Sequence, residues 1–280
     1  MHLLTIGQMA RLNHVSEQTL RLYDRQGLLS PSVRGDNGYR YYDIKQSAVL
    51  DIIQYLKSLG IGLKEIKFQF SEQDLDGIAA ALQKKRRQTQ EEIKALQCRE
   101  KALERTIADL RRFRTAPPDG TIQMEYIPDR QMYLIDTKVN FYDYDLDIYE
   151  SVLRQLQDGL IKNKLPQNYF CNAGTRMASK NYLSQRFYST EAFVFVDQEF
   201  VSDQLITLCP GGNYACIYCD DFYKEKEYAK KLLQYIEKQN CQVSGDYLCE
   251  VISDLPLLFC GERKMFLRLQ VPVMFCTKNE

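Results

Sequence analysis

Apolar residues recur at intervals of three and four through most of the first 70 positions, in short segments separated by turn residues. This spacing predicts helices over residues 6–12, 17–25, 46–59 and 63–68. Thr5 and Gln8 form a capping-box pattern at the first helix start, and Ser16 is a second N-cap candidate. Gly27 ends the second helix. Two short helices joined by about three residues predict a helix-turn-helix.

A strong turn signal, Gly35-Asp36-Asn37-Gly38, interrupts the helical pattern. The Asn-Gly pair is typical of a two-residue hairpin loop, and residues 33–34 and 39–42 flank it as candidate strands. The pattern predicts a small β-wing that presents Arg40 and tyrosine hydroxyls. Such groups are suited to contacts with phosphate oxygens.

The second predicted helix has one apolar side and one polar side. Leu20 is expected to face the core with Val15, whereas Gln18, Arg21 and Arg25 share the opposite side. Long polar and cationic side chains on an exposed helix can read base edges in the major groove of DNA. The same pattern is also typical of a solvated helix face, so it does not decide the function by itself.

Residues 75–114 form the longest segment with helical periodicity, without glycine or proline after Gly77. A heptad seam of ten positions runs through it, and seven of them are apolar: Ala79, Leu82, Ile93, Leu96, Leu103, Ile107 and Leu110. The seam predicts a coiled coil between two copies of the chain, with packing against the chain's own second half as the alternative. Two prolines and a glycine within residues 115–120 end the helix and mark a linker.

In the second half, apolar runs with strand-like spacing are separated by two amphipathic helices. The strands are predicted at residues 132–139, 168–178, 191–196, 204–208, 214–219, 247–252 and 264–273. The helices are predicted at residues 146–164 and 225–239. Because the order strand–helix–strand–strand occurs twice, we expect an α+β domain of two β-α-β-β repeats.

Charge divides the chain at the same place as the periodicity. The 37 Lys and Arg balance the 37 Asp and Glu over the whole chain. However, residues 1–114 contain 20 basic and 14 acidic residues, and residues 115–280 contain 17 and 23. A basic first half and an acidic second half indicate partners of opposite charge, although a solvated basic helix would give the same balance.

Composition excludes several protein classes. With 45% hydrophobic residues the chain can bury a core, and no apolar stretch is long enough for a transmembrane helix. No signal peptide is recognisable, and the nine cysteines are scattered. We therefore expect a cytoplasmic protein with free thiols and no membrane partner.

The cysteine pair Cys216-x-x-Cys219 lies on a predicted strand, where its two thiols point to opposite faces. The two histidines of the chain, His2 and His14, are far from it in sequence. We therefore expect no metal site, no cofactor and no catalytic residues.

Five blocks within the first 70 residues together resemble the successive blocks of the MerR family of winged-helix regulators. They occur in order and at the expected spacing, at residues 6–10, 19–24, 27–31, 37–42 and 56–61. On this resemblance and the pattern above, DNA contacts are expected from Gln18, Thr19, Arg21, Tyr23, Arg40, Tyr41 and Lys57. The chain departs from the family at Leu22, where the first of two aromatic residues usually stands, so the phosphate contact that this ring would make is not expected here.

The MerR resemblance also implies how such a protein works. It implies a homodimer, paired through antiparallel helices, that binds a palindrome in double-stranded promoter DNA. Effector binding would then distort a promoter with an over-long spacer and realign it for RNA polymerase. Such distortion costs on the order of a few kcal/mol, which protein contacts can supply.

The second half resembles the GyrI-like effector-binding domain of the multidrug-responsive branch of the family, on residues 210–215 and 244–250. That resemblance places Glu250, in an otherwise apolar strand, at the acidic residue that lines the drug pocket. A partly buried carboxylate among aromatic rings suits a small lipophilic or cationic effector. The aromatic contacts are expected from Tyr169, Phe170, Tyr188, Tyr214 and Phe266. An exposed Glu250, with the aromatic residues in the core, is the alternative.

The predicted fold class is therefore multidomain. An all-α winged helix-turn-helix occupies residues 1–74, a coiled-coil dimerisation helix 75–114, a linker 115–120 and an α+β effector-binding domain 121–280. The predicted function is ligand-responsive transcription regulation and not catalysis. Two alternatives for the second half are a small-molecule hydrolase with Glu250 as general base and a protein-docking module.

Overall fold

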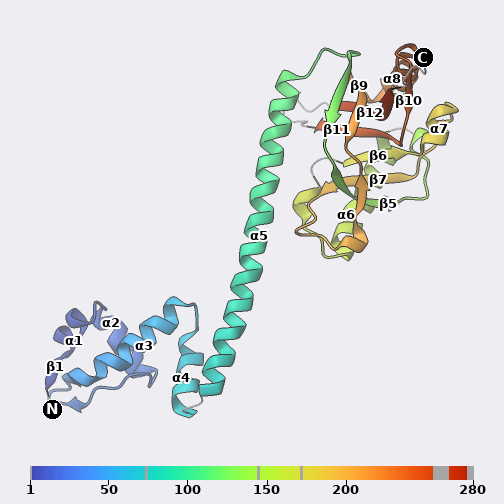
Figure 1. Ribbon diagram of the computed structural model, residues 1–280. Helices are drawn as coiled ribbons and strands as arrows, with labels where there is room; N and C mark the ends of the chain where they lie inside the picture. Colours follow the sequence, from blue (N-terminus) through green and yellow to red (C-terminus); the bar gives the residue numbers. More distant parts are fainter. Residues whose placement is uncertain (1, 73–74, 144–145, 171–172, 255–264, 276–280) are drawn as a thin grey trace. The chain divides into compact units, whose positions relative to one another are not determined.

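The computed structural model describes all of the chain except residues 1, 73–74, 144–145, 171–172, 255–264 and 276–280. The chain divides into two compact units, residues 1–94 and 95–280 (Figure 1). Each unit has its own hydrophobic core, and each is described by itself below.

The N-terminal unit is a helical domain with a small three-stranded antiparallel sheet in the order β1-β3-β2. Its elements are β1 (Leu3–Thr5), α1 (Ile6–Leu12), α2 (Glu17–Arg25), β2 (Val33–Arg34), β3 (Arg40–Asp43), the 3-10 turn η1 (Ile44–Gln46), α3 (Ser47–Ser58) and α4 (Leu63–Glu72). Buried side chains from α1, α2, α3 and α4 share one core with Tyr42 of β3. This arrangement confirms the winged helix-turn-helix that the sequence predicts.

Local capping explains where the first two helices begin. The Thr5 hydroxyl accepts a hydrogen bond from the backbone N–H of Gln8, and the Gln8 side chain accepts one from the Thr5 backbone, so the predicted capping box is confirmed. The Ser16 hydroxyl likewise accepts from the Thr19 backbone at 3.0 Å and caps α2. Gly27 follows α2 with φ +65°, a conformation that favours glycine.

The hairpin loop of the wing differs from the predicted two-residue turn. Gly38 N–H donates to the Gly35 carbonyl, and Gly35 N–H donates to the Tyr39 carbonyl. The loop therefore has three residues, with Gly38 in the left-handed region at φ +77°. A bare Asn-Gly pair does not distinguish the two loop lengths, because both need a residue of positive φ near the turn.

The helix α5 (Leu75–Thr115) runs as one element from the N-terminal unit into the C-terminal unit. Within residues 95–115, Cys98 and Ala102 are buried, whereas Leu103, Ile107 and Leu110 of the predicted seam are 42–60% exposed. The buried stripe lies two positions from the seam, which is about 200° around a helix. One side of α5 therefore packs on its own chain, and the predicted coiled-coil seam remains on the other side.

The C-terminal unit contains a sheet with the strand order β4-β9-β12-β11-β6-β7-β5-β8, and β10 pairs with β12. The strands are β4 (Ile122–Ile127), β5 (Arg130–Asp136), β6 (Ala173–Met177), β7 (Glu191–Val196), β8 (Thr207–Cys209), β9 (Gly212–Cys219), β10 (Cys241–Val243), β11 (Tyr247–Asp254) and β12 (Met265–Phe275). The helices are α6 (Leu146–Lys162), α7 (Ser179–Leu183) and α8 (Glu225–Lys238). Four 3-10 turns accompany them: η2 (Phe141–Asp143), η3 (Gln167–Tyr169), η4 (Asp203–Leu205) and η5 (Phe222–Lys224).

Two related halves build this sheet, which confirms the predicted pair of β-α-β-β repeats. In the first half, β5, α6, β6 and β7 occur in this order, with the short helix α7 between β6 and β7, and β7 lies between β5 and β6 in the sheet. In the second half, β9, α8, β11 and β12 occur in the same order, with the short β10 between α8 and β11, and β12 lies between β9 and β11. The halves join where β6 pairs with β11. The strand that precedes each half in the chain pairs with the other half: β4 pairs with β9, and β8 pairs with β5.

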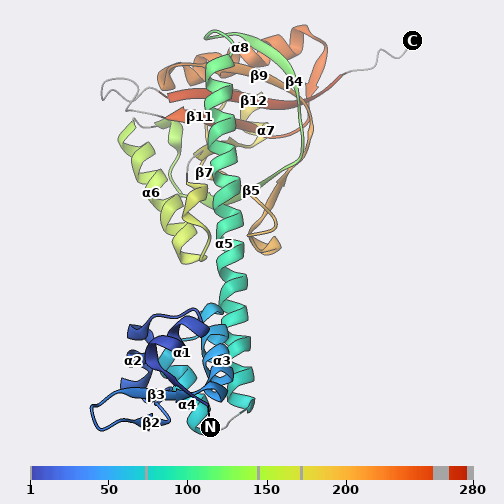
Figure 2. The same cartoon turned by 90° about the vertical axis from the view of Figure 1, so that its left-hand side faces the viewer.

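The two faces of the sheet have different neighbours. The helices α6 and α8 share a large core with one face (Figure 1). The α5 segment 95–115 lies against the other face, where it is joined to the sheet by ion pairs (Figure 2). Successive residues of β11 alternate between the two faces, as the pleat of a strand requires.

Three elements of this unit are absent from the sequence-based prediction: β4, β10 and the five-residue helix α7. The two strands lie at the ends of the pairing network, and β10 has only three residues. Their pairing partners are remote in the chain, so a local pattern gives little sign of them. Among the described helices, none has the length and apolar character that crossing a membrane would need.

Candidate functional site

The outward side of α2 is an exposed polar surface. Gln18 is exposed, Thr19 is half-buried, and Arg21 is 48% exposed and pairs with Glu17 of the preceding turn at 3.4 Å. Lys57, near the end of α3, is also exposed. These side chains are available to a nucleic acid, as the sequence analysis expects.

The wing is tied to α2 by a buried carboxylate. Asp24 accepts two hydrogen bonds from Arg34 at 2.8 Å each and one from the Nε of Arg40 at 2.7 Å. Burial would raise the pKa of Asp24, but the hydrogen bonds from Arg40 and Arg34 outweigh it, so the pKa lies below its ordinary value. The cluster holds two wing arginines beside the helix, with their positive charges only partly compensated.

Tyr23 does not occupy the predicted position at the DNA-facing surface. Its side chain is 1% exposed and lies in the N-terminal core, which corrects the expectation that it contacts DNA. Tyr41 is half-buried on the wing, and Arg40 is bound to Asp24. Sequence analysis missed Asp24 and Arg34. The position of Arg34 next to the wing turn was the available signal.

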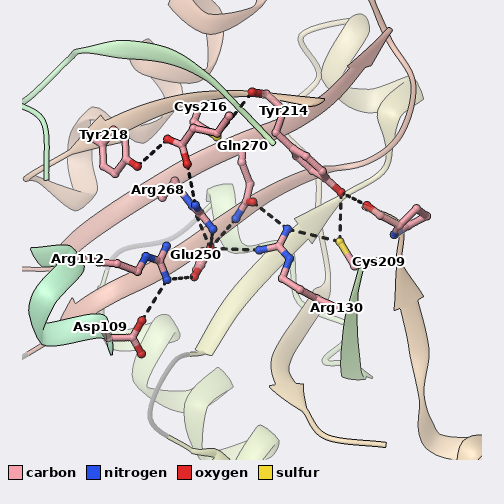
Figure 3. Close-up of polar contacts among 12 residues, drawn as sticks. Asp109, Arg112, Arg130, Cys209, Tyr214, Cys216, Tyr218, Glu250, Arg268 and Gln270 are labelled. Carbon is pink, nitrogen blue, oxygen red and sulfur yellow. Dashed lines mark hydrogen bonds and ion pairs between the residues drawn. The ribbon is translucent and has the colours of Figure 1, made fainter. Parts of the chain in front are cut away.

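Glu250 lies on the face of the sheet that α5 covers, inside a cluster of arginines (Figure 3). Its Oε2 accepts hydrogen bonds from Arg268 at 2.7 and 3.2 Å, from Gln270 at 2.7 Å and from Arg130 at 3.4 Å. Its Oε1 accepts one from Arg112 of α5 at 3.0 Å. Glu250 is only 2% exposed, so the alternative of an exposed strand face is wrong.

The arginines already neutralise Glu250. Burial alone would raise its pKa, but the charges of Arg268, Arg112 and Arg130 outweigh burial and hold the pKa at about 2. A carboxylate with three cationic partners has no deficit of positive charge that a ligand would fill. Glu250 lines a cavity of about 330 Å³ with Tyr169 and Phe195, but four arginines line the same cavity and make it cationic.

A cavity of about 170 Å³ lies on the opposite face of the sheet, between its strands and the starts of the two helices. Its walls come from both halves of the domain. They are lined by Phe141, Tyr142, Tyr149, Gly174, Thr175, Phe222, Tyr223, Glu225, Lys226, Cys249, Val251, Met265 and Leu267. The Phe-Tyr pair at the start of η2 and the Phe-Tyr pair at the start of η5 occupy corresponding places in the two repeats.

A second buried carboxylate, Glu225, lines this cavity from the first residue of α8. Its Oε1 accepts hydrogen bonds from the hydroxyls of Tyr142 at 2.7 Å and Tyr247 at 3.0 Å. Burial raises the pKa of Glu225, against the lowering effect of these hydrogen bonds and of nearby Lys226. A concave, aromatic site with one buried carboxylate has the composition of a small-molecule pocket.

The structure places the predicted ligand contacts in several separate parts of the C-terminal unit. Tyr169 lies near Glu250 with Arg105 and Asp197, and Tyr214 packs against Arg130. Phe266 contacts Phe113 and Tyr218 on the α5 side of the sheet.

The other two predicted contacts are set apart from that cluster. Phe170 packs at the edge of the core on the helix side of the sheet. Tyr188 is 44% exposed and stacks on Arg186. None of the five predicted aromatic residues lines the cavity of Glu225.

The residues missed by sequence analysis are Tyr142, Glu225 and Cys249. The repeated Phe-Tyr pair before each helix was a usable signal for the first two. Cys249 precedes Glu250 in the sequence, and the strand register decides which of the two faces the cavity. Among the described residues, no cluster of His, Cys, Asp and Glu side chains is arranged to hold a metal ion.

Comparisons with known proteins agree with this architecture. Residues 4–72 match the family described as MerR HTH family regulatory protein. The chain is 26% identical over 250 residues to the multidrug-efflux transporter 2 regulator of Bacillus subtilis (strain 168), with 89% of each chain covered. It is 25% identical over 280 residues to the multidrug-efflux transporter 1 regulator of the same strain, with 96% of each covered.

Among solved structures, the cryo-EM structure of an EcmrR–DNA complex is similar with a TM-score of 0.43 and 16% identity, over 98% of this chain and 100% of that one. The family match covers the capped helices, the wing and α4, and both Bacillus relatives extend through the C-terminal unit. Residues 4–72 therefore form a domain of the MerR HTH family, and the chain as a whole is similar to two Bacillus transporter regulators.

Proposed function

We propose that this regulator responds to a small effector that binds in the cavity around Glu225. The observation that carries the proposal is a buried carboxylate, inside an aromatic cavity, whose hydrogen-bond partners Tyr142 and Tyr247 are uncharged. A carboxylate in that setting is stabilised by a proton or by a cation. The N-terminal unit would supply DNA binding and the cavity would supply the response.

A small lipophilic cation fits this cavity best. Its charge would pair with Glu225, and the rings of Phe141, Tyr149 and Phe222 would supply stacking and cation–π contacts. The names of the two Bacillus relatives, both multidrug-efflux transporter regulators, support an effector of this class. The effector carboxylate that sequence analysis assigned to Glu250 is thus assigned here to Glu225.

DNA binding is proposed for the outward side of α2 and the wing. Gln18, Thr19 and Arg21 would face the major groove, while Arg34, Arg40, Tyr41 and Lys57 would contact phosphates. The promoter palindrome, the distorted spacer and the contact with RNA polymerase are parts of the same proposal. A protein that acts on the bacterial chromosome would be located in the cytoplasm.

Dimerisation is proposed through the exposed side of α5. Leu96, Leu103, Ile107 and Leu110 form a stripe of exposed apolar side chains, and the opposite stripe already packs on the sheet. A helix with such a stripe requires a partner to remove it from water. A second copy of α5 provides the same stripe.

The C-terminal unit is proposed to bind its ligand without chemical change. Glu225 is the one titratable carboxylate that the cavity lining contains, and both histidines of the chain belong to the N-terminal unit. The Cys249 thiol also lines the cavity, but burial raises its pKa, so the thiol stays protonated and is a poor nucleophile. Such a site suits recognition better than hydrolysis.

N-methylquinolinium and neutral quinoline test the cation proposal, since they have nearly the same shape and differ in charge. Wild-type protein should bind the cation more tightly. Glu225→Gln, which keeps the shape of the side chain, should weaken cation binding by about tenfold to a hundredfold, because interactions with a charged group contribute roughly 1.5–3 kcal/mol. Calorimetry measures both.

Glu199→Gln, at an exposed carboxylate on the other side of the sheet, is the control for the general loss of one negative charge. Equal binding of quinoline and its methylated cation would contradict the cationic effector. An unchanged affinity in Glu225→Gln would contradict the site.

A further inference from the structure

The strand β11 carries the cavity and the arginine cluster on its two faces. Cys249 and Val251 line the cavity on the helix side. Glu250, between them in sequence, faces α5 on the other side. A ligand seated against Cys249 and Val251 therefore lies one residue away from the contact between the sheet and α5.

The two oxygens of Glu250 have different partners. Oε2 is held inside the sheet by Arg268, Arg130 and Gln270. Oε1 faces α5, and Arg112 is its hydrogen-bond donor among the described residues, at 3.0 Å. Loss of Arg112 would thus leave the carboxylate bound in the sheet but detached from α5.

Arg112 has a second partner within its own helix. The same nitrogen, Nη1, lies 3.1 Å from Asp109 Oδ1, one turn earlier in α5. Arg112 Nη1 is thus within hydrogen-bond distance of both carboxylates at once, and it keeps Asp109 as a partner when Glu250 withdraws. The contact with Glu250 can therefore be made or broken without leaving Arg112 an unpaired charge, which gives the contact two discrete states.

Two other ion pairs join α5 to the C-terminal unit, but neither reaches β11. Arg105 binds Asp197 at 2.6 Å, and Lys101 binds Glu199 at 2.7 Å. Both carboxylates lie in the segment that follows β7. Among the three ion pairs within the described residues, the one between Arg112 and Glu250 reaches β11. Beside it, Phe113 of α5 packs against Phe266 of β12 with ring centroids 5.5 Å apart.

We propose that Glu250 and Arg112 are the positioning residues that transmit occupancy of the cavity to α5. This inference rests on the proposed function, since it takes the cavity as the effector site. A bound effector displaces the backbone of β11 at Cys249 and Val251. Glu250 moves with it and breaks or strengthens its contact with Arg112, which keeps Asp109 as a partner, and this changes how the C-terminal end of α5 is held. Because α5 is one helix from Leu75 to Thr115, the change reaches the residues that continue into the N-terminal unit.

Hydrogen exchange of α5 in the full-length protein, with and without N-methylquinolinium, tests the coupling. In wild type, the cation should change exchange of amides in residues 105–115 by at least about fivefold, the lower end of typical coupling between sites. In Arg112→Gln the cation should still bind, but those amides should no longer respond. Lys101→Gln removes a comparable ion pair away from β11 and should respond like wild type.

Cys249→Met tests the same coupling without a ligand, because it adds side-chain volume inside the cavity. It should alter exchange in residues 105–115, and the double variant with Arg112→Gln should not. If the cation binds wild type without affecting α5, or if Arg112→Gln retains the response, the coupling is wrong. If wild type does not bind N-methylquinolinium, the proposal of a cationic effector is wrong. The comparison of Cys249→Met with its Arg112→Gln double variant still tests the coupling.

Discussion

Glu250 and Glu225 are both buried in the C-terminal unit, on opposite faces of one sheet, and their environments differ in charge. Glu250 is bound by three arginines, and the pKa of its carboxyl falls to about 2. Glu225 is bound by two tyrosine hydroxyls, and burial raises its pKa. Burial alone therefore does not decide whether a carboxylate is a structural anchor or a ligand site. The charge of its partners decides it.

The largest expected effect separates the two carboxylates by stability. Glu250→Gln removes the negative charge that compensates Arg112, Arg130 and Arg268, so we expect unfolding to become easier by about 3 kcal/mol or more. Glu225→Gln removes a charge that burial disfavours and should leave stability at pH 7 unchanged or raised. Denaturant unfolding of both variants at pH 7 measures the difference. Similar losses in both would show that the two environments are equivalent after all.

A third buried carboxylate extends the comparison to the N-terminal unit. Asp24, like Glu250, is bound by arginines, so Asp24→Asn should free Arg34 and Arg40 and loosen the wing. We expect a loss of about 1–3 kcal/mol of stability and weaker binding to promoter DNA. Glu17→Gln, which changes an exposed pair on the same helix, is the control and should have little effect on stability. Unchanged DNA affinity in Asp24→Asn would separate the cluster from DNA binding.

The smallest expected effect is a difference in pH dependence. The lowered pKa of Glu250 means that its stabilisation is present above its ordinary pKa of 4.5 and is lost as pH falls toward 2. The raised pKa of Glu225 has the opposite sign: stability is highest below 4.5 and falls as pH rises through the raised value. Each group changes stability by at most about 1.4 kcal/mol per pH unit.

Unfolding of wild type and the two glutamine variants across pH 2–8 checks these signs. Glu250→Gln should flatten the acid side of the profile, and Glu225→Gln should flatten the region above 4.5. Tyr142, Tyr247, Cys249 and Lys226 surround Glu225 and remain in both variants. A profile that Glu225→Gln leaves unchanged would contradict its raised pKa.

Local chemistry explains the elements that sequence analysis predicted well. Thr5 and Ser16 cap their helices through contacts only three residues away, and Gly27 and Gly38 supply positive φ within a single turn. Such contacts depend on neighbours in the chain, so a sequence pattern contains them. The strand β7 and the helix α8 were likewise predicted from periodicity alone, nearly to their observed ends.

Distance along the chain explains what was missed. The pairing of β4 with β9 joins residues more than 80 positions apart, and Tyr142 meets Glu225 across 83 positions. Tyr23 was assigned to DNA from its place in a motif, whereas the packing of α1, α2 and α3 buries it. No spacing rule contains these contacts, because each depends on how separate elements pack.

The sequence by itself determined the winged helix-turn-helix, the long helix with its heptad seam, and the two repeats of the second half. Capping, periodicity and glycine placement act over a few residues, and they suffice for these elements. Only the tertiary structure decided the roles of Cys249, Glu250 and Glu225. Adjacent residues of β11 point to opposite faces, and the elements that cover each face, α5 with its arginine and α8 with its glutamate, come from distant parts of the chain.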